Sequence, residues 1–133
     1  MTGRMERHTT PKTAKRRAWQ AMSKYIRARD PYCVTCPNPT TDAGHFQYNT
    51  ERNQQLGGNL LWFDERNING QCAKCNRFAA GMLVPYNLYL QKKYGPTVTQ
   101  ELYDLWRTPK KWTLEEILER EQHFKDKLAA LYA

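Results

Sequence analysis

The sequence contains no long apolar run and almost no acidic residue near its start. A membrane-spanning helix needs about 18 consecutive apolar residues, and no stretch of these 133 residues approaches that length, which excludes a transmembrane role. Residues 1–10 are basic and lack an apolar core, so they do not form a secretory signal, and we expect a cytoplasmic protein. The length suits one compact domain with helical additions, and the apolar fraction of 40% excludes a wholly disordered chain.

The shortage of acidic residues makes the beginning of the chain strongly basic. Residues 1–29 contain nine Lys or Arg and one acid, Glu6, so this segment alone accounts for the net charge of +8. A basic block joined to a neutral body is typical of nucleic-acid-binding proteins, although a solvated cationic tail has the same composition. We expect phosphate contacts from this block and from three cations near the second cysteine pair: Lys15, Arg16, Arg17, Lys24, Arg27, Arg66, Lys74 and Arg77.

Helical patterns occupy both ends of the chain, and short strands are expected between them. Pro11 can open a helix that continues without Gly or Pro to Arg29, after a flexible arm over residues 1–10. Thr113 and Glu116 have the spacing of a capping box and predict the start of a C-terminal helix. The other predicted elements are strands at 42–48 and 60–64, a polar loop at 49–59, a turn at 65–70, and helices at 76–80, 86–94 and 98–106.

All four cysteines fall in two CxxC pairs, Cys33/Cys36 and Cys72/Cys75, with 35 residues between the pairs. Two such pairs complete a tetrahedral thiolate site, which predicts a structural Zn²⁺ ion. Disulfides are the competing interpretation, but no export signal favours them, and a thioredoxin-like motif would need a βαβ unit that the sequence lacks. A closed four-thiolate site leaves no coordination position open, so any catalysis needs other residues.

Three polar residues around the cysteine pairs are candidates for chemistry: His45, Asn67 and Asn76. An imidazole can take a proton from water near pH 7, one amide can orient it, and a second amide oxygen can bind a hard cation. Such a set can hydrolyse a phosphodiester. Taken singly, each residue also has an ordinary structural explanation, as a surface histidine or as a turn-forming asparagine. Their combination with the second cysteine pair is more specific.

This combination resembles the phage NinG/Rap recombination endonuclease family, within the HNH or ββα-metal class of treble-clef nucleases. The segments that carry the resemblance are 42–46, 65–76 and the helix at 18–30, and the similarity extends to about residue 95. It implies an α+β fold in which a zinc-stabilised treble-clef (ββα-metal) core carries a basic N-terminal helix and additional C-terminal helices. The expected parts are a basic arm and helix at 1–30, a nuclease core at 31–95 and a helical extension at 96–133.

The resemblance also implies a role for each candidate residue. His45 takes the place of the general base, Asn67 positions that histidine, and Asn76 is a ligand of the catalytic divalent ion, Mg²⁺ or Mn²⁺. Many enzymes of this class carry an acidic metal ligand just before the base, where this chain has Gly44. The tentative replacements for that carboxylate are Asp42 and Glu65.

The function that the resemblance implies is a phage- or prophage-encoded, metal-dependent endonuclease acting in the bacterial host on branched or partly single-stranded DNA, such as D-loops and Holliday junctions. The alternative is a non-catalytic zinc-binding module that recognises DNA or a recombination protein. A separation of more than about 10 Å between His45 and Asn76 would favour this alternative, because one hydrated phosphate would not reach both groups. The apolar face of the C-terminal helix suits either a homodimer surface or packing on its own domain.

Overall fold

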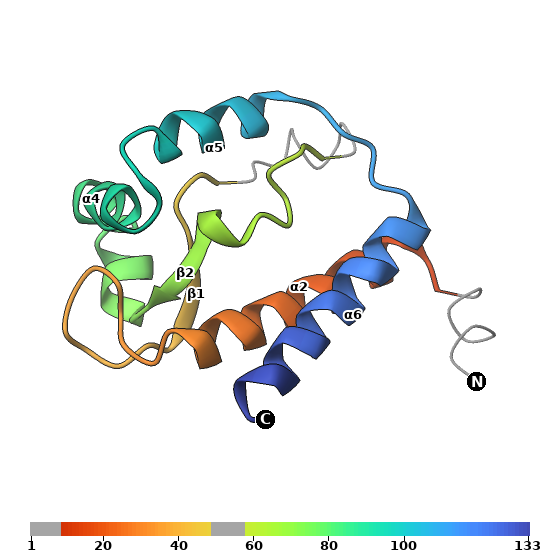
Figure 1. The fold of residues 1–133 in the computed structure, drawn as a ribbon, viewed down its shortest axis with the longest axis horizontal. Helices are drawn as coiled ribbons and strands as arrows, with labels where there is room; N and C mark the ends of the chain where they lie inside the picture. Colours follow the sequence, from red (N-terminus) through yellow and green to blue (C-terminus); the bar gives the residue numbers. More distant parts are fainter. Residues whose placement is uncertain (1–8, 49–57) are drawn as a thin grey trace.

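The computed structural model describes residues 9–48 and 58–133, so most of the predicted arm and of the predicted polar loop lies outside the described residues. Helices surround one small antiparallel sheet (Figure 1), which confirms the α+β class. The elements in chain order are α2 (Pro11–Arg29), β1 (Asp42–His45), the 3₁₀ turn η1 (Glu65–Asn67), β2 (Ile68–Gln71), the π-helical turn η2 (Lys74–Phe78), α4 (Leu83–Tyr94), α5 (Val98–Arg107) and α6 (Leu114–Leu131).

α2 begins and ends where the local sequence predicts. The Thr10 hydroxyl accepts a hydrogen bond from the Thr13 N–H at 3.2 Å, and Pro11 opens the first turn, where a backbone donor would have no partner. The helix ends at Arg29, shortly before a proline. Its apolar stripe is buried and consists of Ala14, Ala18, Met22, Tyr25 and Ile26.

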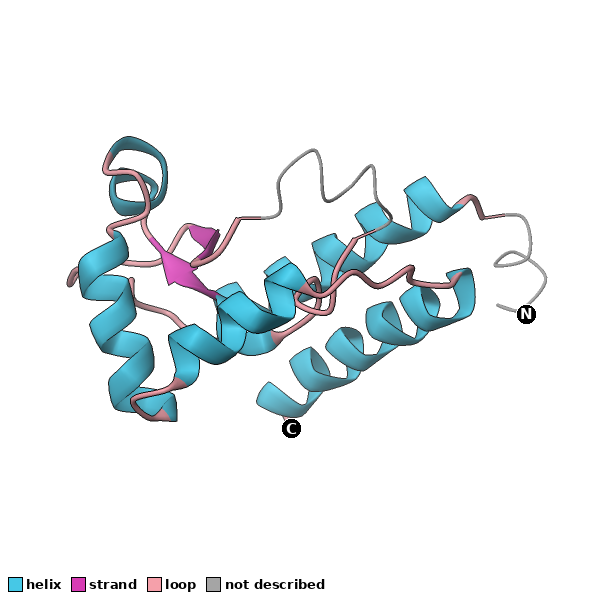
Figure 2. Ribbon diagram, turned by 90° about the horizontal axis from the view of Figure 1, so that it is seen from above, coloured by secondary structure: helices cyan, strands magenta, loops and turns pink. Residues whose placement is uncertain are grey.

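α6 runs beside α2 in the same direction (Figures 1 and 2), and its Ile117 and Phe124 side chains are fully buried in the same apolar core. The capping box is confirmed, because the Thr113 hydroxyl accepts from the Glu116 N–H while the Glu116 carboxylate accepts from the Thr113 N–H. The C-terminal extension therefore packs on the N-terminal helix of its own chain. A homodimer stays a prediction.

The sheet corrects one prediction from the sequence. β1 pairs with β2 in antiparallel register, Asp42 opposite Gln71 and His45 opposite Ile68. β2 therefore lies in the segment predicted as a turn, whereas the predicted strand at 60–64 is a turn that buries Leu61 and Phe63. The prediction was wrong because the true strand is polar and the turn is apolar. Here burial depends on partners distant in the sequence rather than on β propensity.

A second apolar core is formed between α4, α5 and the turn at 60–63, and consists of Leu61, Tyr86, Leu90, Val98 and Leu102. α4 begins three residues before the predicted position, after Met82, whose φ of 52° turns the chain. The predicted helix at 76–80 is instead the single π-helical turn η2. Within the described residues, no helix is both long and apolar enough to cross a membrane.

Candidate metal cluster and basic cavity

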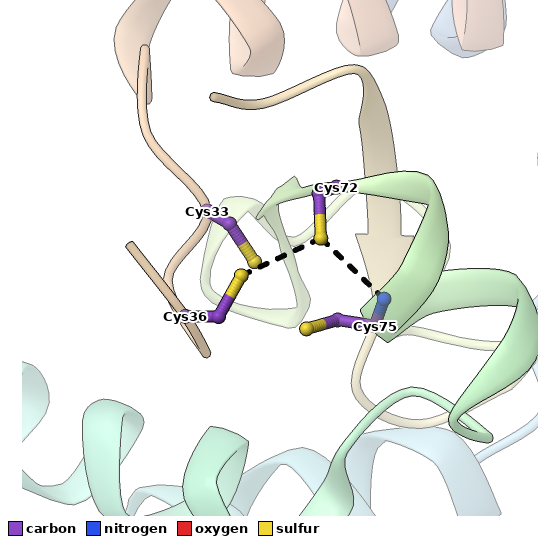
Figure 3. A group of neighbouring side chains, drawn as sticks. All are labelled: Cys33, Cys36, Cys72 and Cys75. Carbon is purple, nitrogen blue, oxygen red and sulfur yellow. Dashed lines mark hydrogen bonds between the residues drawn. The ribbon is translucent and has the colours of Figure 1, made fainter. Parts of the chain in front are cut away.

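The four cysteines come together at the end of the sheet. Cys33 and Cys36 lie in the loop after α2, Cys72 directly follows β2, and Cys75 lies in the first turn of η2 (Figure 3). Their sulfur atoms all lie within 4.8 Å of one another. A tetrahedral zinc site with Zn–S bonds of about 2.3 Å needs sulfur separations of about 3.8 Å, so these thiols can hold a metal ion such as zinc.

Hydrogen bonds shape the cluster before any ion binds. The Cys75 N–H donates to Cys72 Sγ at 3.5 Å, and Thr35 Oγ1 lies 3.2 Å from Cys33 Sγ. Burial opposes ionisation of Cys33, but the hydrogen bonds from Thr35 and from backbone N–H groups outweigh it and lower the pKa of Cys33 to about 6. Burial raises the pKa of Cys75 to about 12. The thiolate is the form that binds a metal ion, so Cys33 is the thiol most readily available to one.

β1 directs its side chains alternately to two faces of the hairpin. On one face, the imidazole of His45 stacks on Trp19 of α2, with ring centres 4.9 Å apart and planes inclined by 25°. On the other face, Asp42 accepts a hydrogen bond from Asn76 Nδ2 at 3.0 Å. The structure thus brings Asn76 together with Asp42 and places His45 on the opposite face of the same strand.

His45 lies in a cavity of about 670 Å³ between α2 and the turn that follows residue 58. Among the described residues that line it there is no acidic side chain. Burial lowers the pKa of His45 to about 4, so its imidazole is neutral at pH 7 and can accept a proton. The lining residues are Lys12, Lys15, Arg16, Trp19, His45, Tyr48, Trp62 and Phe63.

Asn67 is almost completely buried and acts on the backbone beside His45. Its Oδ1 accepts from the Gln47 N–H at 2.8 Å, and its Nδ2 donates to the Gln47 carbonyl at 2.9 Å. Its own carbonyl accepts from the Phe46 N–H at 2.9 Å. Asn67 therefore fixes the chain just after His45, and within the described residues neither amide atom is bonded to the imidazole.

The face of β1 that carries Asp42 gathers several polar groups. Burial opposes ionisation of Asp42, but hydrogen bonds from Asn76 and from the Arg77 guanidinium outweigh it and lower the pKa of that carboxyl. A Cβ on Gly44 would overlap Gln71 Oε1 and would meet Asn76 Oδ1 at 3.0 Å, so both oxygens face this glycine. Gln71 Oε1 is buried and accepts no hydrogen bond from the described residues. Sequence reasoning missed Gln71, whose only signal was its position directly before Cys72.

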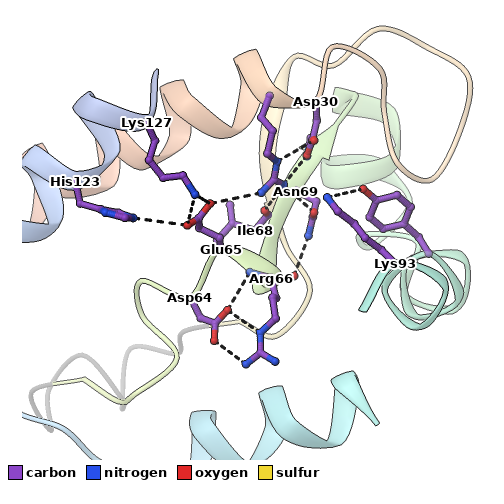
Figure 4. Close-up of polar contacts among 12 residues, drawn as sticks. Asp30, Asp64, Glu65, Arg66, Ile68, Asn69, Lys93, His123 and Lys127 are labelled. Atoms are coloured by element: carbon purple, nitrogen blue, oxygen red, sulfur yellow. Dashed lines mark hydrogen bonds and ion pairs between the residues drawn. The ribbon is translucent and has the colours of Figure 1, made fainter. Parts of the chain in front are cut away.

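Glu65, the other candidate carboxylate, belongs to a polar network between α2, the sheet and α6 (Figure 4). Both of its oxygens accept from Lys127 Nζ at 3.0 Å, and Arg29 and His123 lie at 4.0 and 3.7 Å. Arg29 in turn donates to Asp30 and Asn69. These contacts join the C-terminal helix to the hairpin.

The predicted phosphate contacts divide into two groups. Lys15 and Arg16 line the cavity together with Lys12, which sequence reasoning missed although residues 12, 16 and 19 share one helical face. Three further members of this first group are exposed: Lys24 and Arg27 on α2, and Lys74 between the cysteines of the second pair. The second group is paired with carboxylates inside the protein: Arg17 with Glu121, Arg66 with Asp64 and Glu101, and Arg77 with Asp42.

Comparisons with known proteins match nearly the whole chain. The family model described as "Bacteriophage Lambda NinG protein" matches residues 4–133. The chain is 34% identical over 121 residues to "Protein ninG" of Escherichia phage 933W, 34% to that of Salmonella phage P22 and 33% to that of Escherichia phage lambda. Each alignment covers 87% of this chain and 56–57% of the relative, so the chain spans little more than half the length of these curated relatives. No solved structure matches.

Proposed function

Because the chain belongs to the NinG family, we propose that it is a metal-dependent DNA endonuclease that hydrolyses phosphodiesters in branched recombination intermediates, such as D-loops and Holliday junctions, during phage recombination. The position of His45 supports this proposal most directly. Its imidazole is in the neutral form that a general base needs, and it shares its cavity with Lys12, Lys15 and Arg16, which can hold a phosphate. Because a pKa of about 4 makes the imidazole a weak base, the support comes from this position and not from its basicity.

In this proposal the four cysteines hold a structural Zn²⁺ ion in a treble-clef core. The ion would tie the loop after α2 to the start of η2 and so fix both strands of the hairpin. With four thiolate ligands it has no open position, and its contribution is to folding rather than to the reaction.

A catalytic Mg²⁺ or Mn²⁺ ion would be held on the Asp42 face of β1. Asp42 and Asn76 are in contact there, and the buried Gln71 Oε1 without a donor fits the oxygen ligands that such ions prefer. Both carboxylates are paired with a cation, Asp42 with Arg77 and Glu65 with Lys127. Glu65 is the poorer candidate because only Asp42 is in contact with Asn76. When bound, a divalent ion neutralises charge on the leaving oxygen of a phosphodiester.

The test is cleavage of a synthetic four-way junction and a D-loop by the purified chain with Mg²⁺ or Mn²⁺. His45→Ala should abolish cutting and leave the zinc content unchanged. His123→Ala is the matched control, because this histidine lies in α6 beside Glu65 and outside the cavity, and it should cut as the parent chain does. Equal cutting by the parent chain and His45→Ala would overturn the assignment of His45 as the base.

A non-catalytic zinc-binding module that recognises DNA is the second candidate function. The opposite orientation of His45 and Asn76 on β1 favours it, because one phosphate has to meet both groups during hydrolysis. If the chain binds the junction tightly but does not cleave it in the presence of either Mg²⁺ or Mn²⁺, this second function is supported over the first.

A further inference from the structure

A row of flat rings lines the cavity around His45 and ends at an exposed tyrosine, Tyr48. Trp19 stacks on His45, and the ring of Tyr48 continues the row, nearly parallel to the imidazole at 21° with ring centres 6.5 Å apart. The Tyr48 side chain is 51% exposed. An exposed aromatic face at the end of a stack is a surface on which another flat ring can bind.

Trp62 also lines the cavity, and its indole is contacted by Lys15, Gly58 and Phe63. Lys15 Nζ lies 4.5 Å from the centre of a Trp62 ring, and a Cβ on Gly58 would meet the same indole at 2.7 Å. Phe63 packs edge-on against Trp62. Because these neighbours restrict the indole, its side chain loses little conformational entropy when a ligand binds against it.

The charge of the cavity indicates what it binds. Lys12, Lys15 and Arg16 add three positive charges to an aromatic lining, and no described lining residue carries a negative charge. A ligand that matches both features has an anionic group and a flat ring, as a nucleotide does. A base inside a duplex presents no free ring face, so an unpaired base is required.

We propose that this cavity binds an unpaired nucleobase stacked on Tyr48, with the adjoining phosphates on Lys12, Lys15 and Arg16. Its volume of about 670 Å³ is within the range of about 300–1,000 Å³ typical of small-ligand sites. This inference rests on the nucleic-acid part of the proposed function and specifies its substrate as DNA with an unpaired nucleotide at the branch. It does not depend on cleavage.

The experiment measures binding of the full chain to single-stranded DNA containing one 2-aminopurine and to a blunt duplex of the same length. Stacking should quench the 2-aminopurine fluorescence. Tyr48→Ala should remove the quenching and weaken single-strand binding about tenfold while changing duplex binding less than twofold. Tyr48→Phe keeps the ring and should bind as the parent chain does. Tyr132→Ala is the control, because this tyrosine is 78% exposed at the end of α6, away from the cavity.

Salt dependence separates stacking from charge. Tyr48→Ala removes no charge, so its slope of log affinity against log salt should equal that of the parent chain, whereas Lys15→Gln should reduce the slope by about one for both DNAs. Unchanged single-strand affinity in Tyr48→Ala, or equal losses on both DNAs, would overturn the inference. Binding without cleavage would overturn only the endonuclease proposal. Cleavage together with unchanged single-strand binding by Tyr48→Ala would overturn only the stacking site.

Discussion

The α2/α6 helix pair and the hairpin–knuckle region (residues 31–48 and 64–82) differ in what fills their interiors. The helix pair has an apolar core in which Met22, Ile26, Ile117 and Phe124 are fully buried. The hairpin–knuckle region has Asn69 and Gln71 fully buried, and its hydrophobic cluster consists mainly of the four cysteines. Apolar burial stabilises the first region, whereas the second depends on satisfied polar groups and, under our proposal, on a metal ion.

The two regions meet in a network of charged groups. Arg29 at the end of α2 donates to Asn69 of β2, and Asp30 accepts from the Gly70 N–H at 2.9 Å. Glu65 joins the same network to Lys127 of α6. This network can couple the unfolding of one region to that of the other. The stability of each region in variants of the other measures how strongly they are coupled.

The largest effect should follow loss of the cysteine cluster. Cys72→Ser should lose the bound zinc and unfold the hairpin–knuckle region, because structural zinc contributes about 10–16 kcal/mol in zinc-finger peptides. Zinc content and hydrogen exchange of residues 64–82 measure this effect. Lys74→Ala, an exposed change between the two cysteines of the same pair, should retain zinc. A Cys72→Ser chain that keeps its zinc and its protection would show that this region is not held by metal.

A smaller effect is expected in the apolar core of the helix pair. Phe124 is fully buried and stacks near Tyr25, with ring centres 6.2 Å apart, so Phe124→Ala should lower the free energy of unfolding by about 3–5 kcal/mol. Zinc content should stay unchanged below the unfolding transition. Phe78→Ala, at a side chain that is 83% exposed, should change stability by less than about 0.5 kcal/mol. Loss of zinc from a Phe124→Ala chain that is still folded would show that the metal site depends on the packing of the helix pair.

His45 lies where the two regions touch, and its titration reports on that contact. Its pKa is about 4 in the fold and about 6.5 in the unfolded chain, so between these values the unfolded state binds more protons. Protons therefore favour the unfolded chain in this range. The free energy of unfolding should be highest above pH 6.5 and should fall by up to about 3 kcal/mol as the pH falls toward 4. Denaturant unfolding at several pH values should show this decline in the parent chain and a flatter profile in His45→Gln. Parallel profiles would mean that His45 is not buried against α2.

The two helices α2 and α6 could be predicted because their signals are local, whereas the packing of one on the other was left open by the sequence. Thr10 and Pro11 mark the start of α2, and the Thr113/Glu116 capping box marks the start of α6. The cysteine cluster was equally accessible, since ligand type and spacing alone bring four thiols to one ion. These features depend on residues close in sequence or on a strong chemical preference.

β1 lies within the predicted strand at 42–48, but β2 and the cavity could not be predicted, because they depend on partners far apart in the chain. Asn69 is buried in β2 because Arg29 and Tyr86 satisfy its amide, and neither partner is visible from its neighbours. The face that His45 occupies follows from strand register, and a shift of one residue would reverse it. Trp62 and Phe63 complete the cavity from a turn that the sequence predicted as a strand.

The smallest effect tests how tightly the polar interior is packed. In Gly44→Ala the new methyl group would overlap Gln71 Oε1, whose amide is held by Nε2 hydrogen bonds to the Gly81 carbonyl at 2.9 Å and to Thr35 at 3.1 Å. Chemical unfolding should show a loss of about 1–2 kcal/mol, because this side chain cannot move freely. Gln71→Ala in the same chain removes the overlap, so the double variant should be more stable than the sum of the two single effects predicts. If the effects of Gly44→Ala and Gln71→Ala on the free energy of unfolding simply add, Gln71 moves aside without cost. The interior of the hairpin–knuckle region would then be more loosely packed than the core of the helix pair.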